Sequence, residues 1–168
     1  MKKLLLFILA IILISINANL AQTKGKLVIV GGEQTNDIVK KYVELAGGCD
    51  AKIIVIPNAG SEPKYWSEVQ VEEFTDLGAQ AEYLLFTRQT ADDEANLKKM
   101  DWANAVFFLG GDQSDLARDM LGTKLLSKVF DIYNNGGTVG GSSAGAAIMS
   151  EVMITGNELV NKDSTVSF

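Results

Sequence analysis

Short apolar segments alternate with amphipathic ones along this chain, and few folds accommodate that alternation. The apolar segments are residues 26–30, 52–56, 81–86 and 103–109, with a very short one after Gly136-Gly137. Segments that are apolar at nearly every position are typical of strands covered on both faces, as in parallel sheets. We therefore expect one three-layer α/β domain over residues 22–168, with a mainly parallel sheet.

The segments between these strands carry helix signals. Asn36 is a predicted N-cap, and Gly47-Gly48 ends the helix that it begins. Pro63 opens a second helix. Along this second helix the apolar residues Trp66, Val69 and Phe74 recur. The other predicted helices are residues 90–100 with Asp92, Asp93 and Glu94 in the first turn, residues 113–120 with Asp112 as N-cap, and residues 125–135.

Residues 141–145 read Gly-Ser-Ser-Ala-Gly and fit G-x-S-x-G, the pattern of a serine on a sharp turn between a strand and a helix. The two glycines would let strand and helix approach closely. Free N–H groups at the start of the new helix can stabilise an oxyanion. We predict that Ser143 is a nucleophile; the alternative is a helix entry in which small residues only pack tightly.

Glycine-containing loops follow three of the predicted strands, at Gly31-Gly32, residues 57–61 and residues 110–113. The carboxyl ends of parallel strands lie at one edge of a sheet, so these loops are expected to converge near Ser143. The pattern G-x-G-x-x-G is absent after the first strand, and the chain has one cysteine and no histidine. We therefore expect neither a nucleotide cofactor nor a metal.

Two blocks of the sequence resemble a known family. Residues 140–150, Gly-Gly-Ser-Ser-Ala-Gly-Ala-Ala-Ile-Met-Ser, are similar to the nucleophile segment of the cyanophycinases, in peptidase family S51, which also holds aspartyl dipeptidase (peptidase E). Residues 106–113, ending in Gly-Gly-Asp-Gln, are similar to a strand and loop of that family. The resemblance runs from about Gly25 to the end of the chain, and implies a flavodoxin-like, class I glutamine amidotransferase-like fold.

The resemblance also implies roles for individual residues. The N–H groups of Ala144 and Gly111 would form the oxyanion hole, and Gln113 with the neighbouring Asp112 would contact substrate. From the residues alone, Gly110-Gly111 is equally well explained as a strand-to-helix turn capped by Asp112.

Serine catalysis generally needs a base, usually histidine, and this sequence contains none. The family carries an acidic residue and then its histidine after the nucleophile. Glu158 lies at about the right separation for the acidic member, Asp163 is a second choice, and a solvated loop carboxylate is the alternative reading of Glu158. We expect the domain to be C-terminally incomplete, with the base in a missing region.

Residues 1–21 have the form of a secretory signal peptide: Lys2 and Lys3, an apolar run, and a small residue, Ala21, at a possible cleavage site. An uncleaved anchor is the alternative, although the run is short for a membrane span. We expect a secreted or periplasmic protein without stable membrane association. Removing Lys2 and Lys3 changes the formal charge from −6 to −8, which argues against nucleic-acid binding and suits a cationic substrate.

The resemblance implies a serine exopeptidase without cofactor that cleaves the polyaspartate backbone of cyanophycin to β-Asp-Arg dipeptides through an acyl-enzyme on Ser143. The expected partner is this peptide polymer, and a homodimer is possible. Aspartyl dipeptidase activity, a generic α/β-hydrolase esterase and a non-catalytic binding module are the alternatives. The esterases usually carry an HGGG-type motif, which this sequence lacks.

Overall fold

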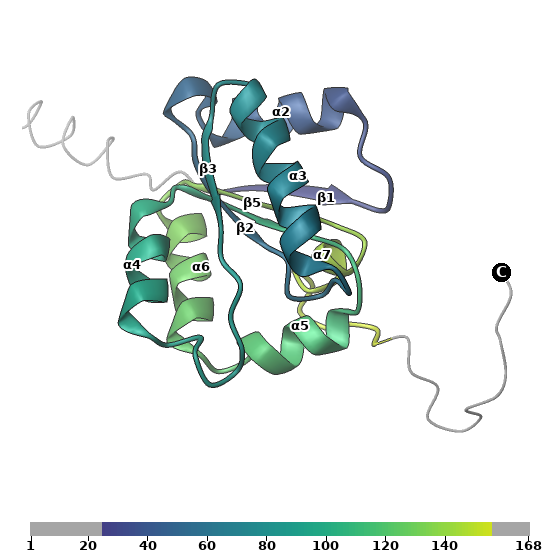
Figure 1. Cartoon of the computed structure of the whole chain (residues 1–168), viewed down its shortest axis with the longest axis vertical. Coiled ribbons are helices and arrows are strands. Elements are labelled where there is room, and N and C mark those ends of the chain that lie inside the picture. Colours follow the sequence, from purple (N-terminus) through teal and green to yellow (C-terminus); the bar gives the residue numbers. More distant parts are fainter. Residues whose placement is uncertain (1–24, 156–168) are drawn as a thin grey trace, which may run out of the picture.

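A computed structural model of the chain describes residues 25–155, in which a five-stranded parallel sheet lies between two layers of helices (Figure 1). This confirms the three-layer α/β class predicted from the sequence. The strands are β1 (Lys26–Val30), β2 (Lys52–Ile56), β3 (Gln80–Tyr83), β4 (Ala105–Phe108) and β5 (Thr138–Ser142). The helices are α2 (Asn36–Ala46), the 3-10 helix η1 (Gly48–Asp50), α3 (Pro63–Asp76), α4 (Glu94–Trp102), α5 (Gln113–Met120), α6 (Lys124–Asn134) and α7 (Ala144–Ala147).

The strand order is β1-β5-β4-β2-β3, with every neighbouring pair parallel. Strands β2 to β5 follow the flavodoxin-like order, and β1 is added at the edge beside β5. The chain runs outward from β2 to β3 and then back past β2 to β4, so the order reverses between β2 and β4. Open α/β sheets bind ligands at the carboxyl ends of the strands next to such a reversal.

Two hydrophobic cores cover the two faces of the sheet. On one face Tyr42 of α2 and Phe74 of α3 stack at a ring separation of 5.2 Å, and both rings meet Phe107 of β4 edge-on. On the other face α4 and α6 cover Ile54, Val106 and Val139 (Figure 1). Strands β2 and β4 are buried on both faces, which explains their unbroken apolar sequences.

Several predicted element ends differ in the structure. Strand β3 ends at Tyr83 rather than Phe86, and β4 covers Ala105–Phe108 rather than residues 103–109. The N-cap of α2 is Thr35, so Asn36 is already helical. By contrast Asp112 is the predicted N-cap of α5, and its carboxylate accepts a hydrogen bond from Ser114 N at 2.7 Å.

The largest difference concerns the helix predicted over residues 90–100. Helix α4 begins at Glu94, which leaves Asp92 before the helix. The Asp92 carboxylate instead accepts hydrogen bonds from the backbone N–H groups of Lys124, at 2.7 Å, and Leu125, at 3.3 Å. These groups belong to the first turn of α6, so Asp92 stabilises the start of a helix that is distant in sequence.

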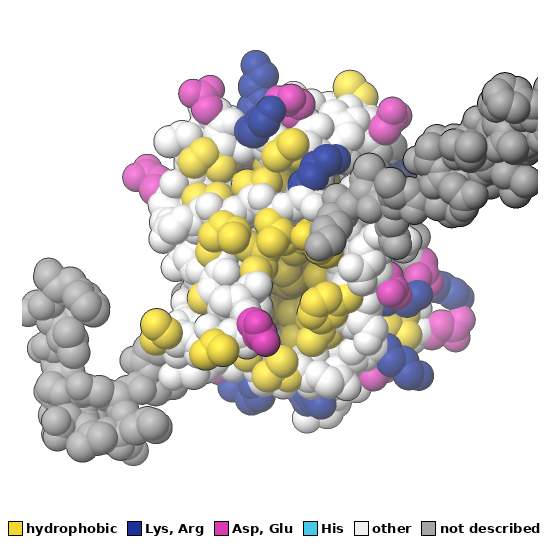
Figure 2. Space-filling model, turned by 180° about the vertical axis from the view of Figure 1, so that it is seen from behind, with side chains coloured by type: hydrophobic (Ala, Val, Ile, Leu, Met, Phe, Trp, Pro, Cys, Tyr) yellow, Lys and Arg dark blue, Asp and Glu magenta, His cyan; other side chains and the backbone are white. Residues whose placement is uncertain are grey.

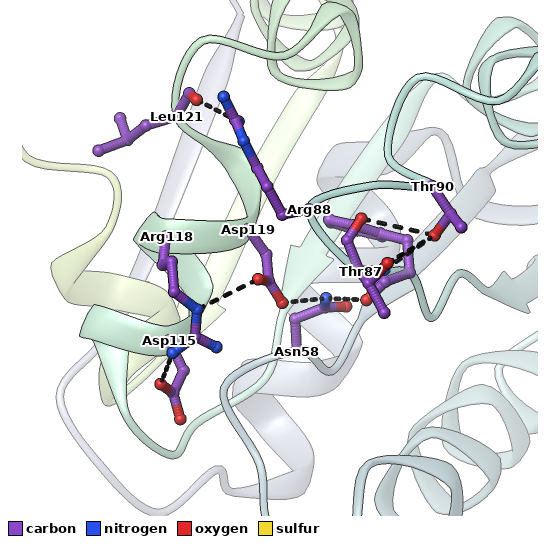
Figure 3. Close-up of polar contacts among 9 residues, drawn as sticks. Asn58, Thr87, Arg88, Thr90, Asp115, Arg118, Asp119 and Leu121 are labelled. Atoms are coloured by element: carbon purple, nitrogen blue, oxygen red, sulfur yellow. Dashed lines mark hydrogen bonds and ion pairs between the residues drawn. The ribbon is translucent and has the colours of Figure 1, made fainter.

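Polar contacts connect the loops at the carboxyl ends of the strands (Figure 3). Asn58, just after β2, donates from Nδ2 to the Phe86 carbonyl at 2.6 Å and to Asp119 Oδ2 at 3.3 Å. Asp119 also pairs with Arg118, and the Arg88 guanidinium donates to the Leu121 carbonyl. The loops after β2 and β3 are thereby fixed to helix α5, which follows β4.

Seen from behind the view of Figure 1, the molecule has an apolar hollow (Figure 2). It has a volume of about 400 Å³ and lies between β1, α6 and the segment after α7, with Leu27, Phe130 and Met149 among its lining residues. Leu27 and Phe130 are 49% and 59% exposed. Within residues 25–155, no helix has the length and hydropathy that crossing a membrane requires.

Candidate active site

Ser143 lies on a strained turn between β5 and α7. Its φ of 52° and ψ of −114° make it the one non-glycine residue with positive φ among residues 25–155. Such a conformation is disfavoured for a residue with a side chain and is concentrated at functional sites. Ser143 N donates to the Val30 carbonyl at 2.9 Å, and its own carbonyl accepts from Ala146 and Ala147. The turn is thus held by β1 on one side and by α7 on the other, with the serine exposed.

The glycines on either side of Ser143 permit the close contact of strand and helix. A Cβ added to Gly141 would lie 2.5 Å from the Gly145 carbonyl oxygen, and one added to Gly145 would lie 2.1 Å from that of Phe108. Both distances are far below a van der Waals contact, and both involve backbone atoms that cannot rotate away. The predicted reason for glycine at both ends of G-x-S-x-G is therefore confirmed.

The loop after β4 lies directly beside Ser143. A Cβ on Gly110 would lie 3.2 Å from Ser143 Cβ and 3.8 Å from its Oγ. Gly111 has a φ of 140°, and a side chain there would collide with Ala59 of the loop after β2. Asp112 N donates to the Ala59 carbonyl at 2.7 Å. The loops after β2 and β4 are thus joined at the serine, as the sequence predicted.

Gln113 is engaged with the segment that follows α7. Its Nε2 donates to the Ile154 carbonyl at 2.9 Å, and Ser114 Oγ lies 3.5 Å from the Thr155 carbonyl. Asp112 is occupied as the N-cap of α5. A substrate contact by either side chain stays a prediction.

A cavity of about 290 Å³ extends from Ser142 and Gly110 toward α3. A chain of side-chain hydrogen bonds runs along it. Gln34 Nε2 donates to Ser142 Oγ at 3.3 Å and to Gln70 Oε1 at 3.1 Å, and Gln70 Nε2 donates to Glu73 Oε2 at 2.9 Å. Trp66 and Val69 add apolar surface.

Sequence analysis did not predict this cavity or the residues of α3 that line it. Trp66 was expected among the apolar residues that recur along its helix, but its side chain is 51% exposed and lines the cavity. Gln34 and Gln70 are far from the serine motif in sequence. Gln70 was the one residue that could have indicated the cavity. It is an amide on the buried side of α3, 4% exposed, and a buried polar side chain requires a hydrogen-bond partner.

Glu158, Asp163 and the predicted signal segment 1–21 lie outside the described residues. Of the predicted site residues, the structure brings together Ser143, Ala144, Gly111 and Asp112 at the carboxyl ends of β4 and β5. Gln113 lies in the first turn of α5. The catalytic roles of these residues stay predictions.

Comparison with known proteins agrees with this geometry. Residues 27–167 match the model of peptidase family S51. The chain is 31% identical to the cyanophycinase of Geminocystis herdmanii over 140 residues, which is 79% of this chain and 52% of that protein. It is 32% identical to the cyanophycinase of Synechococcus elongatus over 149 residues, 83% of this chain and 46% of that protein.

A solved structure of similar fold is a peptidase from an acI-B1 Actinobacterium. It superposes with a TM-score of 0.68 at 25% sequence identity, over 77% of this chain and 58% of that one. By the shares given above for the two cyanophycinases, the chain spans about half the length of each of them.

Proposed function

Because the chain belongs to peptidase family S51, we propose that it forms the nucleophile-bearing part of a cyanophycinase-like serine peptidase. The observation that carries the proposal is the position of Ser143. This exposed serine lies on a strained turn at the carboxyl end of β5, in contact with the glycine loop after β4. The identity to two cyanophycinases supports this branch of the family over aspartyl dipeptidase.

In the proposed reaction Ser143 Oγ attacks the carbonyl carbon of a backbone amide and gives up its proton to a general base. The N–H groups of Ala144 and Gly111 stabilise the charge that develops on the carbonyl oxygen. The amide C–N bond then breaks, the leaving amine takes the proton, and an acyl-enzyme on Ser143 remains. Water hydrolyses the ester and restores the serine.

The general base is not among the 168 residues if it is a histidine, since the sequence has none. In this proposal the natural polypeptide supplies it beyond the matched half, and Glu158 orients it as the acidic member. The substrate is the polyaspartate backbone of cyanophycin, released as β-Asp-Arg dipeptides, with Gln113 in contact with substrate. Export directed by residues 1–21 would bring the enzyme to polymer outside the cytoplasm.

The experiment is incubation of the natural full-length protein with cyanophycin, with the soluble products identified by mass spectrometry. We expect β-Asp-Arg from the wild type and none from Ser143→Ala. Cleavage of Asp-X dipeptides without release of β-Asp-Arg would move the protein to the aspartyl dipeptidase branch.

A non-catalytic binding module is the second candidate, favoured by the absence of histidine from the sequence. Reaction with a fluorophosphonate probe separates the two functions. Covalent labelling of the full-length protein that Ser143→Ala abolishes supports the peptidase, and an inert Ser143 supports the binding module.

A further inference from the structure

Asn58 joins the loop after β2 to two other parts of the structure (Figure 3). Its Nδ2 donates to the Phe86 carbonyl, beyond the end of β3, at 2.6 Å and to Asp119 Oδ2 on α5 at 3.3 Å. Its Oδ1 is buried and has no hydrogen-bond partner among residues 25–155. The two bonds of Nδ2 therefore set the orientation of this half-buried side chain and hold the backbone that carries it.

The residue that follows Asn58 is in contact with the loop after β4. The Ala59 carbonyl accepts a hydrogen bond from Asp112 N at 2.7 Å. The same carbonyl lies so close to Gly111 that a side chain on this glycine would collide with it. Ala59 is 6% exposed, so its surroundings leave it little freedom to move. The position of Ala59 therefore determines where the Gly111 backbone lies.

Gly111 connects this contact to the candidate nucleophile. Its neighbour Gly110 lies against Ser143, since a Cβ on Gly110 would be 3.2 Å from Ser143 Cβ. In the proposed function the Gly111 N–H is one of the two donors to the developing oxyanion, and such donors act by being held in place before the reaction. A misplacement of about 1 Å in an active site can cost about 100-fold in rate. A side chain that fixes Ala59 can therefore influence the rate without touching substrate.

We propose that Asn58 is a positioning residue of this active site. It anchors Ala59 to the end of β3 and to α5, and Ala59 in turn holds the Gly111 N–H in the direction of the reacting carbonyl. Asp119 belongs to the same arrangement, because it accepts the second bond from Asn58 and its side chain is 15% exposed. The inference rests on the proposed function for the role of Gly111.

The experiment compares Asn58→Ala with the wild type in the natural full-length protein, with cyanophycin as substrate. We expect kcat to fall about tenfold and KM to stay within about twofold. This split is expected because an oxyanion donor acts on the transition state, whereas loss of a substrate-binding contact would raise KM. Asn58→Asp keeps the shape of the side chain, removes the Nδ2 donor and brings a second carboxylate to Asp119. It should lower kcat at least as much.

Asn96→Ala is the matched control. Asn96 is also half-buried, and its Nδ2 donates to a backbone carbonyl, that of Thr90, at 2.8 Å. Neither residue belongs to the loops after β2 and β4 or to the turn at Ser143. Urea unfolding should show a loss of stability in both alanine variants, because each lacks a side-chain hydrogen bond to the backbone, but Asn96→Ala should leave kcat within about twofold of the wild type. Equal effects of the two substitutions on kcat, or a raised KM with unchanged kcat, would overturn the positioning role.

Hydrogen exchange tests the link to Gly111 without any hydrolysis. The Asp112 N–H bonds to the Ala59 carbonyl, so its exchange reports how firmly the two loops are joined. Mass spectrometry of peptides that contain Asp112 should show exchange about fivefold faster in Asn58→Ala than in the wild type, and no change in Asn96→Ala. Equal exchange rates in the three proteins would rule out the link through Ala59.

Failure of the positioning role and failure of the peptidase function give different results. A wild-type serine that does not react with fluorophosphonate, with exchange at Asp112 still faster in Asn58→Ala, would keep the link between the loops and remove the peptidase. An active wild type whose kcat is unchanged in Asn58→Ala would keep the peptidase and remove the positioning role.

Discussion

Gly145 lies directly against Phe108, so that a Cβ on the glycine would be 2.1 Å from the Phe108 carbonyl oxygen. This contact sets the distance between α7 and the end of β4. It therefore also sets the position of Ser143 relative to the loop at Gly110, because Ser143 precedes α7 and Gly110 follows β4. The two halves of the candidate site are spaced by a contact between backbone atoms.

We predict that Gly145→Ala destabilises the protein by about 2 kcal/mol, measured by urea unfolding. Alanine is the better helix former by roughly 1 kcal/mol, so its intrinsic propensity would favour the variant. The collision outweighs that gain because Phe108 belongs to a strand that is buried on both faces and cannot move aside.

Gly31→Ala is the control for this prediction, since a Cβ at Gly31 has nothing within 4 Å. Its midpoint in urea should stay close to that of the wild type. A Gly145→Ala protein as stable as Gly31→Ala would mean that α7 can shift away from β4 without loss.

The strain at Ser143 leads to a second prediction. A residue with a side chain at this φ and ψ carries roughly 1–3 kcal/mol of strain, which glycine would relieve. Glycine also increases the entropy of the unfolded chain, at a cost of about 0.5–1 kcal/mol. Ser143→Gly should therefore raise the free energy of unfolding by about 1 kcal/mol in thermal or urea unfolding.

Ser143→Ala separates strain from hydroxyl chemistry. It keeps a Cβ in the strained conformation, so its stability should be close to that of the wild type, while both variants lose the proposed nucleophile. A Ser143→Gly protein less stable than Ser143→Ala would show that the turn is not strained in solution.

The sequence predicted the parts of the fold that depend on local patterns. The buried strands β2 and β4 are apolar at nearly every position, and the G-x-S-x-G turn has its close contacts at the two expected glycines. Asp112 caps the helix that it directly precedes. In each case the determining contacts are near in sequence or repeat with the period of the element.

The parts that were missed depend on tertiary docking. Helix α3 presents Gln70 and Trp66 to a cavity whose other walls come from Ser142 of β5 and from the loops after β1, β2 and β4. No local sequence pattern encodes which face of α3 lies against that cavity. Strand β3 is shorter than predicted because it lies at the sheet edge, where Leu85 is exposed and pairing ends after Leu84.

Asp92 supplies a third prediction, since it lies before α4 and bonds to the start of α6. Asp92→Ala leaves two backbone N–H groups without this acceptor and should lower the free energy of unfolding by about 1 kcal/mol. Asp93→Ala is the comparison, because Asp93 is the N-cap of α4 but makes no side-chain capping hydrogen bond. Equal losses in the two variants, measured by urea unfolding, would argue against the capping role of Asp92.

Tyr42 gives a fourth prediction, because its hydroxyl is completely buried and has no hydrogen-bond partner among residues 25–155. Tyr42→Phe removes an unpaired polar group from the core and should raise the free energy of unfolding by about 1 kcal/mol at neutral pH. Tyr65→Phe, which removes an exposed phenol, should have little effect. A Tyr42→Phe protein less stable than the wild type would mean that the hydroxyl finds a partner in solution.

The ionisation of Tyr42 determines how the stability difference between Tyr42→Phe and the wild type changes with pH. Burial raises the pKa of Tyr42 well above the ordinary value of 10.0. Above about pH 10 the unfolded chain loses the phenolic proton while the folded chain keeps it, so the unfolded state binds fewer protons and wild-type stability falls as the pH rises toward the folded pKa. The Tyr42→Phe protein has no phenol at this position and does not lose stability in this way. The difference in free energy of unfolding between Tyr42→Phe and the wild type should therefore grow between pH 9 and pH 11, roughly the range in which an ordinary tyrosine titrates. Urea unfolding across that range measures the difference, and a constant difference would show that Tyr42 ionises in the folded protein as readily as in the unfolded chain.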